Sequence, residues 1–526
     1  MTPDFAAQNW DVIVIGTGIG GGTVGRRLAE RGLSVLFVEK GPNCPRTEQT
    51  ALNPEMFDPP ARRIRGFWPG QVHARINGRD SRFFGPVGAG VGGSSVFYAA
   101  TLERPEPHDL DDSPDRPHPT GGWPVSHAEY RPYFDQVEQL YAISGEADPL
   151  STIPCPDLLD PPPLSAADKT LQKLWQDKGL HPYHLHSAIR RLDGCKDCLG
   201  FKCPKRCKMD GRSAGVEPAL DTGRAALLDN CEVQALEGDT TRITGIRVIR
   251  NGQPMTLRAR TVVLAAGAFG TPRLLLASRS DVWPTGCANA SGFVGRNLMF
   301  HLNELVALWP GKSTAPGVSK ALGFRDLYHV GGERYGMVQA MGIQVSYGEI
   351  VYFLKMLVER SALRRIPMLK ELVRIPAAIA AKLFGNAQVF VGLMEDLPYP
   401  ENCVLLDDDP DVIRFEYTLQ PELLRRRRSF RRLIRKAFRG QRHMFLGLQP
   451  ELNFGHPCGT VRFGTNPETS VLNRDCRAHG LENLYVADAS VFPTSFGVNP
   501  SLMIAANALR VADVIADQHK GTSDAP

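Results

Sequence analysis

The sequence lacks several features that would place the protein in a special class. It contains no uninterrupted run of about 18 apolar residues, the length that a membrane-spanning helix needs. Its first residues, MTPDFAAQNW, lack the charged-then-apolar pattern of a secretion signal. Charge is nearly balanced, with 61 Lys and Arg against 56 Asp and Glu, and a net charge of +5 gives no reason to expect a nucleic-acid partner. We therefore expect a globular, cytoplasmic protein.

The length of the chain and the positions of its cysteines indicate what kind of globular protein it is. A chain of 526 residues that is 42% hydrophobic predicts at least one large core and two or three domains. Thiols stay reduced in the cytoplasm, so clustered cysteines there indicate metal ligands or redox groups before disulfides. Four of the 11 cysteines lie close together, between residues 195 and 207, and the others are scattered.

The first forty residues carry the most informative motif, DVIVIGTGIGGGTVGRRLAERGLSVLFVEKG. The pattern predicts a strand over residues 11–15, a glycine turn, a helix to about Arg31 and a second strand over residues 34–38. Gly16, Gly18 and Gly21 occupy the G-x-G-x-x-G positions, which let the backbone approach a pyrophosphate at a helix N-terminus. Glu39 follows at the distance expected of an acid that accepts a ribose hydroxyl. The motif predicts an adenine dinucleotide, either NAD or FAD.

Three later segments favour FAD. They are GPVGAGVGGSSVFYAATLERP (85–105), TVVLAAGAFGTPRLLLAS (261–278) and NLYVADASVFPTSFGVNPSLMIAANALRVADVI (483–515). In order and residues they resemble the glucose-methanol-choline (GMC) oxidoreductase family, which includes glucose oxidase, choline oxidase and cholesterol oxidase. The resemblance covers nearly the whole chain at its FAD-binding segments and is weak over about 110–210 and 300–445.

The resemblance implies an α/β fold, in which a Rossmann-like FAD-binding domain faces a substrate domain built on an antiparallel sheet. It implies a discontinuous FAD-binding domain, made of residues 1–125, 205–300 and 448–526. Residues 126–204 and 301–447 would form the substrate domain, which includes the cysteine-rich segment 195–207.

The resemblance also carries over cofactor-binding positions. The loop that would meet the edge of the flavin is Gly92, Gly93, Ser94 and Ser95. Val233 would contact the adenine through a strand backbone, and Asp488 would lie near the ribityl and pyrophosphate groups. Family members with covalent FAD have a histidine just after the Gly-Gly-Ser loop, but residues 96–99 are Val-Phe-Tyr-Ala. We therefore expect noncovalent FAD.

The catalytic positions lie near the C-terminus. His456, in NFGHPCGTVRFG, matches the active-site histidine of the family, and Asn499, in GVNPS, matches its second position. A histidine suits the removal of a hydroxyl proton because its pKa lies near neutrality, and Asn499 offers an uncharged amide donor. Pro500 suits the first turn of a helix, whose electropositive end would face the flavin pyrimidine in the family. His301 is a second-choice ligand or a core histidine.

These residues predict oxidation of an alcohol to an aldehyde or ketone, by hydride transfer to flavin N5. A sugar or related polyol is the favoured substrate, because the cysteine spacing resembles that of sugar dehydrogenases. An aryl, alkyl or sterol alcohol is the alternative, suggested by the apolar helices expected over residues 349–385. Two rivals of other classes are a flavin-free NAD-dependent dehydrogenase and a noncatalytic dinucleotide-binding sensor. The electron acceptor is either oxygen or a redox partner.

The cysteine segment, GCKDCLGFKCPKRCK, has the spacing C-x2-C-x4-C-x3-C. Tight spacing of this kind is typical of iron–sulfur loops, whereas zinc sites more often use two separated C-x2-C pairs. Zinc, reduced thiols and disulfides remain alternatives. Some bacterial FAD-dependent sugar dehydrogenases of the family carry a 3Fe-4S cluster with these x4 and x3 spacings. The resemblance would make Cys198, Cys203 and Cys207 the ligands, with Cys195 adjacent and dispensable.

Two amphipathic segments bear on partners. Residues 423–443, LLRRRRSFRRLIRKAFRGQRH, combine apolar residues at helical spacing with arginines. We expect this helix to pack its apolar stripe on the substrate domain, in preference to lying on anionic lipid. Residues 349–385 form a second basic and apolar region, which fits a substrate entrance, an oligomer contact or a membrane contact equally well.

Overall fold

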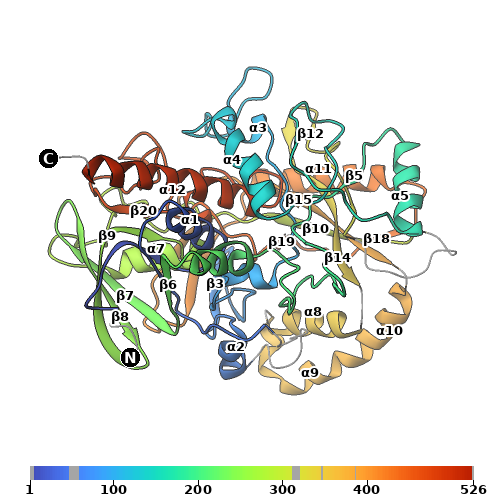
Figure 1. Cartoon of the computed structure of the whole chain (residues 1–526). Coiled ribbons are helices and arrows are strands. Elements are labelled where there is room, and N and C mark those ends of the chain that lie inside the picture. Colours follow the sequence, from blue (N-terminus) through green and yellow to red (C-terminus); the bar gives the residue numbers. More distant parts are fainter. Residues whose placement is uncertain are drawn as a thin grey trace.

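The computed structural model describes residues 5–46, 58–310, 320–344, 347–359, 361–385 and 387–523. Two seven-stranded sheets organise the molecule, and a smaller sheet joins segments that are far apart in the sequence (Figure 1). The predicted α/β fold, with a Rossmann-like sheet and an antiparallel sheet, is confirmed.

The first sheet has the strand order β6-β2-β1-β9-β8-β7, and β20 also pairs with β9. Its strands are β1 (Asn9–Ile15), β2 (Val35–Val38), β6 (Ala225–Leu228), β7 (Cys231–Gly238), β8 (Ile243–Arg250), β9 (Gln253–Leu264) and β20 (Leu484–Val486). β1 lies between β2 and β9 and is parallel to both. Strands in the middle of a parallel sheet are covered on both faces, which explains the unbroken apolar run at residues 12–15.

Helices that pack around this sheet carry the predicted dinucleotide motif and the end of the chain. They are α1 (Ile19–Glu30), α6 (Glu217–Asp221), α7 (Gly267–Ala277) and α12 (Ser501–Ser523). α1 packs against α12 and against the short helix η3 (Gly211–Val216). The first strand, helix and second strand lie where the sequence predicted them, whereas α12 continues eight residues beyond the predicted end at about Ile515.

The second sheet is antiparallel, with the order β18-β10-β15-β14-β11-β5, and β19 pairs with β10. Its strands are β5 (Tyr183–His184), β10 (Leu302–Leu308), β11 (Leu322–Phe324), β14 (Val338–Gln344), β15 (Gln388–Met394), β18 (His443–Phe445) and β19 (Glu451–Leu452). Helix α11 (Pro421–Ala437) packs on it and buries Leu423, Phe430 and Ile434. The apolar stripe of α11 therefore meets the sheet, as the favoured interpretation predicted.

The remaining elements connect the two sheets or extend from them. A four-stranded sheet has the order β16 (Cys403–Leu405), β17 (Ile413–Tyr417), β3 (Val72–Ile76) and β4 (Arg79–Phe83), and a hairpin pairs β12 (His329–Val330) with β13 (Glu333–Arg334). The other helices are α2 (Pro59–Arg65), η2 (Gly93–Phe97), α3 (Pro107–Leu110), α4 (His127–Leu140), α5 (Ala166–Gln176), α8 (Tyr347–Glu359), η4 (Ala362–Arg365), α9 (Pro367–Leu372), α10 (Arg374–Phe384) and η5 (Ala489–Val491). β17 runs parallel to β3, so the small sheet ties the amino-terminal third of the chain to its last third.

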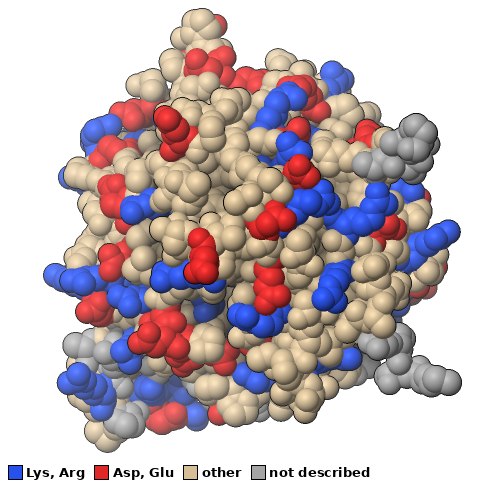
Figure 2. Space-filling view, turned by 90° about the vertical axis from the view of Figure 1, so that its left-hand side faces the viewer, with Lys and Arg blue, Asp and Glu red and all other residues tan. Residues whose placement is uncertain are grey.

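Surface charge is mixed on the face nearest the first sheet. Figure 2 shows Lys and Arg interspersed with Asp and Glu over this face, without a large area of one sign. Among the described residues, no helix has the length and apolar content to cross a bilayer.

Candidate active site

The predicted dinucleotide turn lies between the end of β1 and the start of α1. Gly16 has φ +101°, and a Cβ there would lie 2.4 Å from the carbonyl oxygen of Ala265. A Cβ on Gly21 would lie 2.0 Å from the carbonyl oxygen of Gly16, so both positions require glycine. Gly18 precedes α1 as its N-cap and faces open space. The backbone of the turn is thus closely packed, and there is open space beside Gly18. A pyrophosphate needs both features.

Glu39 follows β2 and is buried. Its Oε2 accepts hydrogen bonds from the backbone N–H of Thr17 (3.2 Å) and from Thr17 Oγ1 (2.5 Å), and its Oε1 accepts from Gly41 N (3.1 Å). Burial raises the pKa of this carboxyl, and the bonds from Thr17 and Gly41 oppose that shift. Cys231 N donates to the Glu39 backbone oxygen (2.9 Å), which brings the start of β7, and with it Val233, beside the predicted ribose acid.

The loop predicted to meet the flavin lies directly against the dinucleotide turn. A Cβ on Gly93 would lie 3.0 Å from the Gly18 Cα, and Gly92 N donates to Thr17 Oγ1 (3.1 Å). Ser95 Oγ donates to Gly92 O (2.6 Å) and accepts from Gly211 N (2.9 Å). Ser94, in contrast, is exposed, and its Oγ accepts from Gly88 N (2.9 Å). The structure therefore brings the two glycine motifs, about 75 residues apart, together.

Asp488 is the N-cap residue of η5, where it joins this segment to α7. Its Oδ2 accepts from Gly267 N (2.9 Å) and Thr271 Oγ1 (2.6 Å), both at the beginning of α7, and its Oδ1 accepts from Ser490 N (2.8 Å). The preceding carbonyl, that of Ala487, would lie 1.7 Å from a Cβ on Gly20. Asp488 thus lies beside the first turn of α1, near the predicted pyrophosphate site.

His456 is paired with His301. The Nδ1 atoms of the two rings lie 3.1 Å apart, and His301 Nε2 lies 2.7 Å from the Phe496 carbonyl oxygen. His301 is fully buried, directly before β10, and His456 lies in the loop after β19. Burial lowers the pKa of His301 to about 4, so its ring is neutral at pH 7. Burial, together with His301 and Lys320, also lowers the pKa of His456 well below its usual range.

The contact with Phe496 fixes the ring proton of His301. A carbonyl oxygen only accepts, so His301 Nε2 carries the proton of the neutral ring and its Nδ1 is an acceptor. A hydrogen bond between the two rings therefore requires that His456 donates from Nδ1, which leaves its Nε2 unprotonated. Asn453 Nδ2 lies 3.2 Å from the same His456 Nδ1, while Asn453 Oδ1 accepts from Gly455 N (3.1 Å), so the amide of Asn453 competes with His301 for this atom.

Asn499 and Pro500 lie at the N-terminus of α12. Asn499 is 9% exposed, and its Oδ1 has no hydrogen-bond partner among the described residues. Pro500 precedes the helix, and its carbonyl accepts from Ile504 N (3.0 Å). Phe496, three residues before Asn499, is the residue whose carbonyl contacts His301. The loop that carries Asn499 therefore lies beside the histidine pair.

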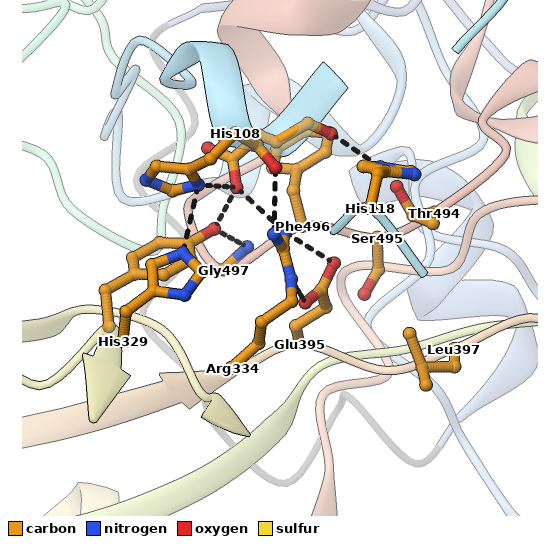
Figure 3. A network of polar contacts seen from close by, with 12 residues as sticks. His108, His118, His329, Arg334, Glu395, Leu397, Thr494, Ser495, Phe496 and Gly497 are labelled. Atoms are coloured by element: carbon orange, nitrogen blue, oxygen red, sulfur yellow. Dashed lines mark hydrogen bonds and ion pairs between the residues drawn. The ribbon is translucent and has the colours of Figure 1, made fainter. Parts of the chain in front are cut away.

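A buried polar network holds this loop (Figure 3). Gly497 N donates to the Tyr328 hydroxyl, which in turn donates to Asp109 Oδ1. Arg334 forms ion pairs with Asp109 (3.4 Å) and with Glu395 (2.8 Å). Burial alone would raise the pKa of Asp109, but His108, Arg334 and Tyr328 together hold it below its usual range. Asp109 is thus an ionised anchor that holds Gly497 through the Tyr328 hydroxyl.

The cysteine segment has no regular secondary structure between residues 195 and 207. Cys198, Cys203 and Cys207 are buried, Cys195 is half-buried, and all four are free thiols. The thiols affect one another: burial and Cys203 raise the pKa of Cys198 to about 11, and burial and Cys195 raise the pKa of Cys207 to about 12. No three of these sulfur atoms lie within 4.8 Å of one another, as a single bound ion would require, and the one group of described residues that meets this criterion is Asp135, Glu138 and Asp157.

Lys208 connects the cysteine segment to the loop at the predicted flavin edge. Its Nζ is fully buried and donates to the carbonyls of Val96 (2.8 Å), Tyr98 (3.3 Å), Cys198 (2.9 Å) and Phe201 (2.6 Å). Burial lowers the pKa of Lys208 to about 8. Cys203 Sγ accepts from the backbone N–H groups of Cys207 (3.2 Å) and Lys208 (3.4 Å), which lower the pKa of its thiol despite burial.

Several of these residues were missed or ranked low by sequence reasoning. His301 was only a second choice, and Asn453, Tyr328 and Asp109 were not singled out. The segment NLMFHLN predicted that His301 lies at the start of a strand. It could not show that the His301 side chain contacts His456. Among the basic residues of the cysteine segment, Lys208 favours the thiolate forms of Cys198 and Cys203 by its positive charge, and its ammonium group also bonds to backbone carbonyls.

Comparison with known proteins identifies the family. Residues 10–303 and 398–508 match the amino- and carboxy-terminal domains of the GMC oxidoreductases. The chain is 27% identical to 2-methyl-1,2-propanediol dehydrogenase of Mycolicibacterium austroafricanum, over 97% of this chain and 96% of that one. It is also 27% identical to the fructose dehydrogenase large subunit of Gluconobacter japonicus, over 97% and 98%. An FAD-dependent oxidoreductase from Chaetomium thermophilum shares the fold, with a TM-score of 0.67 and 17% identity over 97% of this chain and 100% of that one. The chain therefore belongs to the GMC oxidoreductase family and is an FAD-dependent alcohol oxidoreductase.

Proposed function

We propose that this enzyme oxidises a hydroxyl group of a sugar or related polyol, with His456 as the base and noncovalent FAD as the cofactor. The observation that carries the proposal is the chain of contacts from Phe496 O through His301 to His456, which leaves His456 Nε2 unprotonated. A diol dehydrogenase and a fructose dehydrogenase subunit among the relatives favour a polyhydroxylated substrate.

FAD supplies the acceptor for the hydride, at flavin N5, when it is bound. Gly16, Gly18 and Gly21 would hold its pyrophosphate at the N-terminus of α1, and Glu39 its ribose. Gly92, Gly93, Ser94 and Ser95 would lie at the flavin edge, with Val233 at the adenine and Asp488 near the ribityl chain. The residues that follow the Gly-Gly-Ser-Ser loop are Val96, Phe97, Tyr98 and Ala99, and none of them is the histidine that would attach FAD covalently.

Residues of the chain itself accept the proton of the substrate hydroxyl. The substrate hydroxyl transfers its proton to His456 Nε2 as the carbon loses its hydride, so the alcohol becomes an aldehyde or ketone and the ring becomes an imidazolium. His301 accepts the Nδ1 proton of His456 throughout, which keeps Nε2 directed at the substrate. Because the pKa of His456 is lowered, the ring is in its basic form at neutral pH.

Asn499 would orient the same hydroxyl by donating an amide N–H to its oxygen, since the single hydroxyl proton goes to His456. Its side chain is buried, and its Oδ1 has no partner among the described residues, so this amide is available to a ligand. The N-terminus of α12 follows immediately, and its partial positive charge would stabilise negative charge that develops on the flavin pyrimidine.

The cysteine segment determines which electron acceptor we propose for the reduced flavin. Three buried thiols on one loop, with two backbone N–H groups directed at Cys203 Sγ, form a donor set that an iron–sulfur cluster can use. A cluster on Cys198, Cys203 and Cys207 would favour a dehydrogenase with a redox partner. Without a cluster, direct reaction of reduced flavin with oxygen would be favoured.

Anaerobic flavin reduction tests the proposed function. Purified protein should show a flavin spectrum, release FAD on acid precipitation, and lose its yellow colour with sugars or polyols. Bleaching by aryl, alkyl or sterol alcohols alone would replace the polyol with an apolar substrate. A colourless protein that reduces NAD, or a yellow protein that no alcohol bleaches, would contradict the proposal.

A further inference from the structure

Helices α8 to α10 form a peripheral lobe, which we define as residues 347–385, and the structure describes all of these positions except 360. In Figure 1, α9 lies at the lower edge of the molecule and α10 rises along its right side. The helices of the lobe pack mainly on one another, and α8 also packs on β4. The lobe therefore presents a large part of its surface to solvent.

The lobe exposes an unusual amount of apolar surface. Nine of the seventeen exposed large apolar side chains among the described residues belong to it, namely Tyr347, Leu357, Leu363, Ile366, Met368, Leu372, Ile375, Ile379 and Leu383. Single exposed apolar residues are ordinary, but a contiguous group on neighbouring helices is typical of an interaction surface. The lobe thus carries a binding face that the proposed chemistry does not use.

Helix α10 shows that this exposure follows a pattern. Ile375, Ile379 and Leu383 are spaced four residues apart and are 63%, 58% and 64% exposed. Val373, which precedes the helix, and Ala377 are buried and face the body of the protein. The larger apolar side chains therefore point away from the protein, the reverse of a helix that packs its apolar stripe on a core.

Cationic side chains border the apolar face. Arg374 and Lys382 lie on the neighbouring face of α10 and are exposed, and Arg365 is exposed at the end of η4. Lys382 and Arg365 form no ion pair with any described residue, whereas Arg374 pairs with Glu371 (2.8 Å). By sequence, the lobe contains seven Lys and Arg and three Glu, which gives it a net charge of +4.

We infer that this lobe docks the enzyme on the surface of an anionic lipid bilayer, with α10 lying in the interface. Exposed apolar side chains bordered by lysine and arginine are the chemistry that a headgroup and acyl-chain boundary binds. Aliphatic stems of Lys and Arg lie along the apolar layer while their charges reach the phosphates. A second copy of the chain fits less well, because a two-fold contact through this face would bring two lobes of charge +4 together.

Vesicle flotation tests this inference on the full-length holoenzyme. We expect it to float with vesicles of phosphatidylcholine and phosphatidylglycerol, and to bind pure phosphatidylcholine less. The triple variant Ile375→Glu, Ile379→Glu, Leu383→Glu should lose at least about tenfold in vesicle affinity, because three apolar contacts become charged. The matched control Leu150→Glu, Leu159→Glu, Leu448→Glu alters three exposed leucines outside the lobe, with the same change in charge, and should bind as the wild type does.

A second pair of variants tests whether the cationic side chains of the lobe contribute to vesicle binding. Arg365→Gln with Lys382→Gln should weaken binding to phosphatidylglycerol vesicles several-fold, whereas Arg224→Gln with Lys169→Gln, exposed elsewhere, should not. Flavin content and circular dichroism establish that each variant is folded. The inference is overturned if the wild type binds neither vesicle, or if the lobe and control triples bind alike. It is also overturned if light scattering shows a dimer that the lobe triple dissociates while vesicles capture none of it.

Discussion

His301 Nδ1 and His456 Nδ1 lie 3.1 Å apart, although 155 residues separate them in the chain. His301 Nε2 is held by the Phe496 carbonyl at 2.7 Å, so a hydrogen bond between the rings runs from His456 to His301. A residue that touches no reacting atom thus sets the protonation of the proposed base. His301 is a positioning residue in this arrangement, and it distinguishes the site from one with an isolated histidine.

Replacement of His456 tests the proposed base. His456→Ala should lower the rate of flavin reduction by about 10²- to 10⁴-fold, the usual contribution of one acid–base group, while FAD stays bound. Stopped-flow absorbance under anaerobic conditions measures this rate. His479→Ala, whose ring contacts Ser470 Oγ at 2.9 Å, is a matched control that should reduce normally. A near-normal rate in His456→Ala would place the base elsewhere.

The pH dependence of flavin reduction tests the effect of His301. A general base works in its deprotonated form, so the rate should rise with pH through the pKa of His456 and then level off. Burial is the largest cause that lowers this pKa, so the plateau should begin below about pH 7. In His301→Ala the imidazolium of His456 loses the acceptor of its Nδ1 proton, so its pKa should fall further, the midpoint should move to lower pH, and reduction should slow. An unchanged midpoint, with FAD content equal to that of the wild type, would show that His301 has only a structural role.

The position of Asn499 predicts an effect on the flavin itself. Asn499→Asp would place a negative charge at the N-terminus of α12, where reduction of the cofactor must also place negative charge. The flavin potential should fall and reduction should slow by about tenfold or more, which corresponds to roughly 1.4 kcal/mol. Asn499→Ser keeps a neutral polar side chain and should change the potential less. If the potential of Asn499→Asp equals that of the wild type, Asn499 does not lie near the flavin.

Metal analysis decides the role of the cysteine segment. If Cys198, Cys203 and Cys207 hold a 3Fe-4S cluster, anaerobically purified protein should contain iron and acid-labile sulfide and give a low-temperature paramagnetic resonance signal. Cys195→Ser should keep the iron, and Cys203→Ser should lose it. Disulfides would appear as thiols that titrate only after reduction, and zinc as metal without sulfide. Protein made with iron supplied and still lacking iron and sulfide would exclude the cluster.

Lys208 predicts a coupling between the cysteine segment and the flavin-edge loop. Lys208→Met leaves four backbone carbonyls without this donor, which should lower the free energy of unfolding by about 3 kcal/mol or more. Lys205→Met removes one exposed bond, to the Asp193 carbonyl, and should have little effect. Thermal unfolding followed by flavin fluorescence measures both. Equal stability of the two variants would show that Lys208 does not hold the loops together.

The sequence alone determined the features that depend on local pattern. The strand, turn and helix over residues 9–30 follow from an apolar run and from the spacing of Gly16, Gly18 and Gly21. A turn that binds a pyrophosphate leaves no room for side chains at these positions, so the glycines can be recognised from the sequence. The position of α11 on a sheet also followed from its apolar stripe, since helical spacing fixes which residues share a face. Both signals lie within about twenty residues of chain.

Tertiary structure decided what lies between distant segments. Only the fold shows that His301 meets His456, that Asp109 and Tyr328 hold Gly497, and that Lys208 bonds to the carbonyls of Val96 and Tyr98. It also shows that Ile375, Ile379 and Leu383 face solvent, although the same spacing would suit a buried stripe. A periodic pattern defines the faces of an element, but the side on which the rest of the chain packs depends on contacts over hundreds of residues.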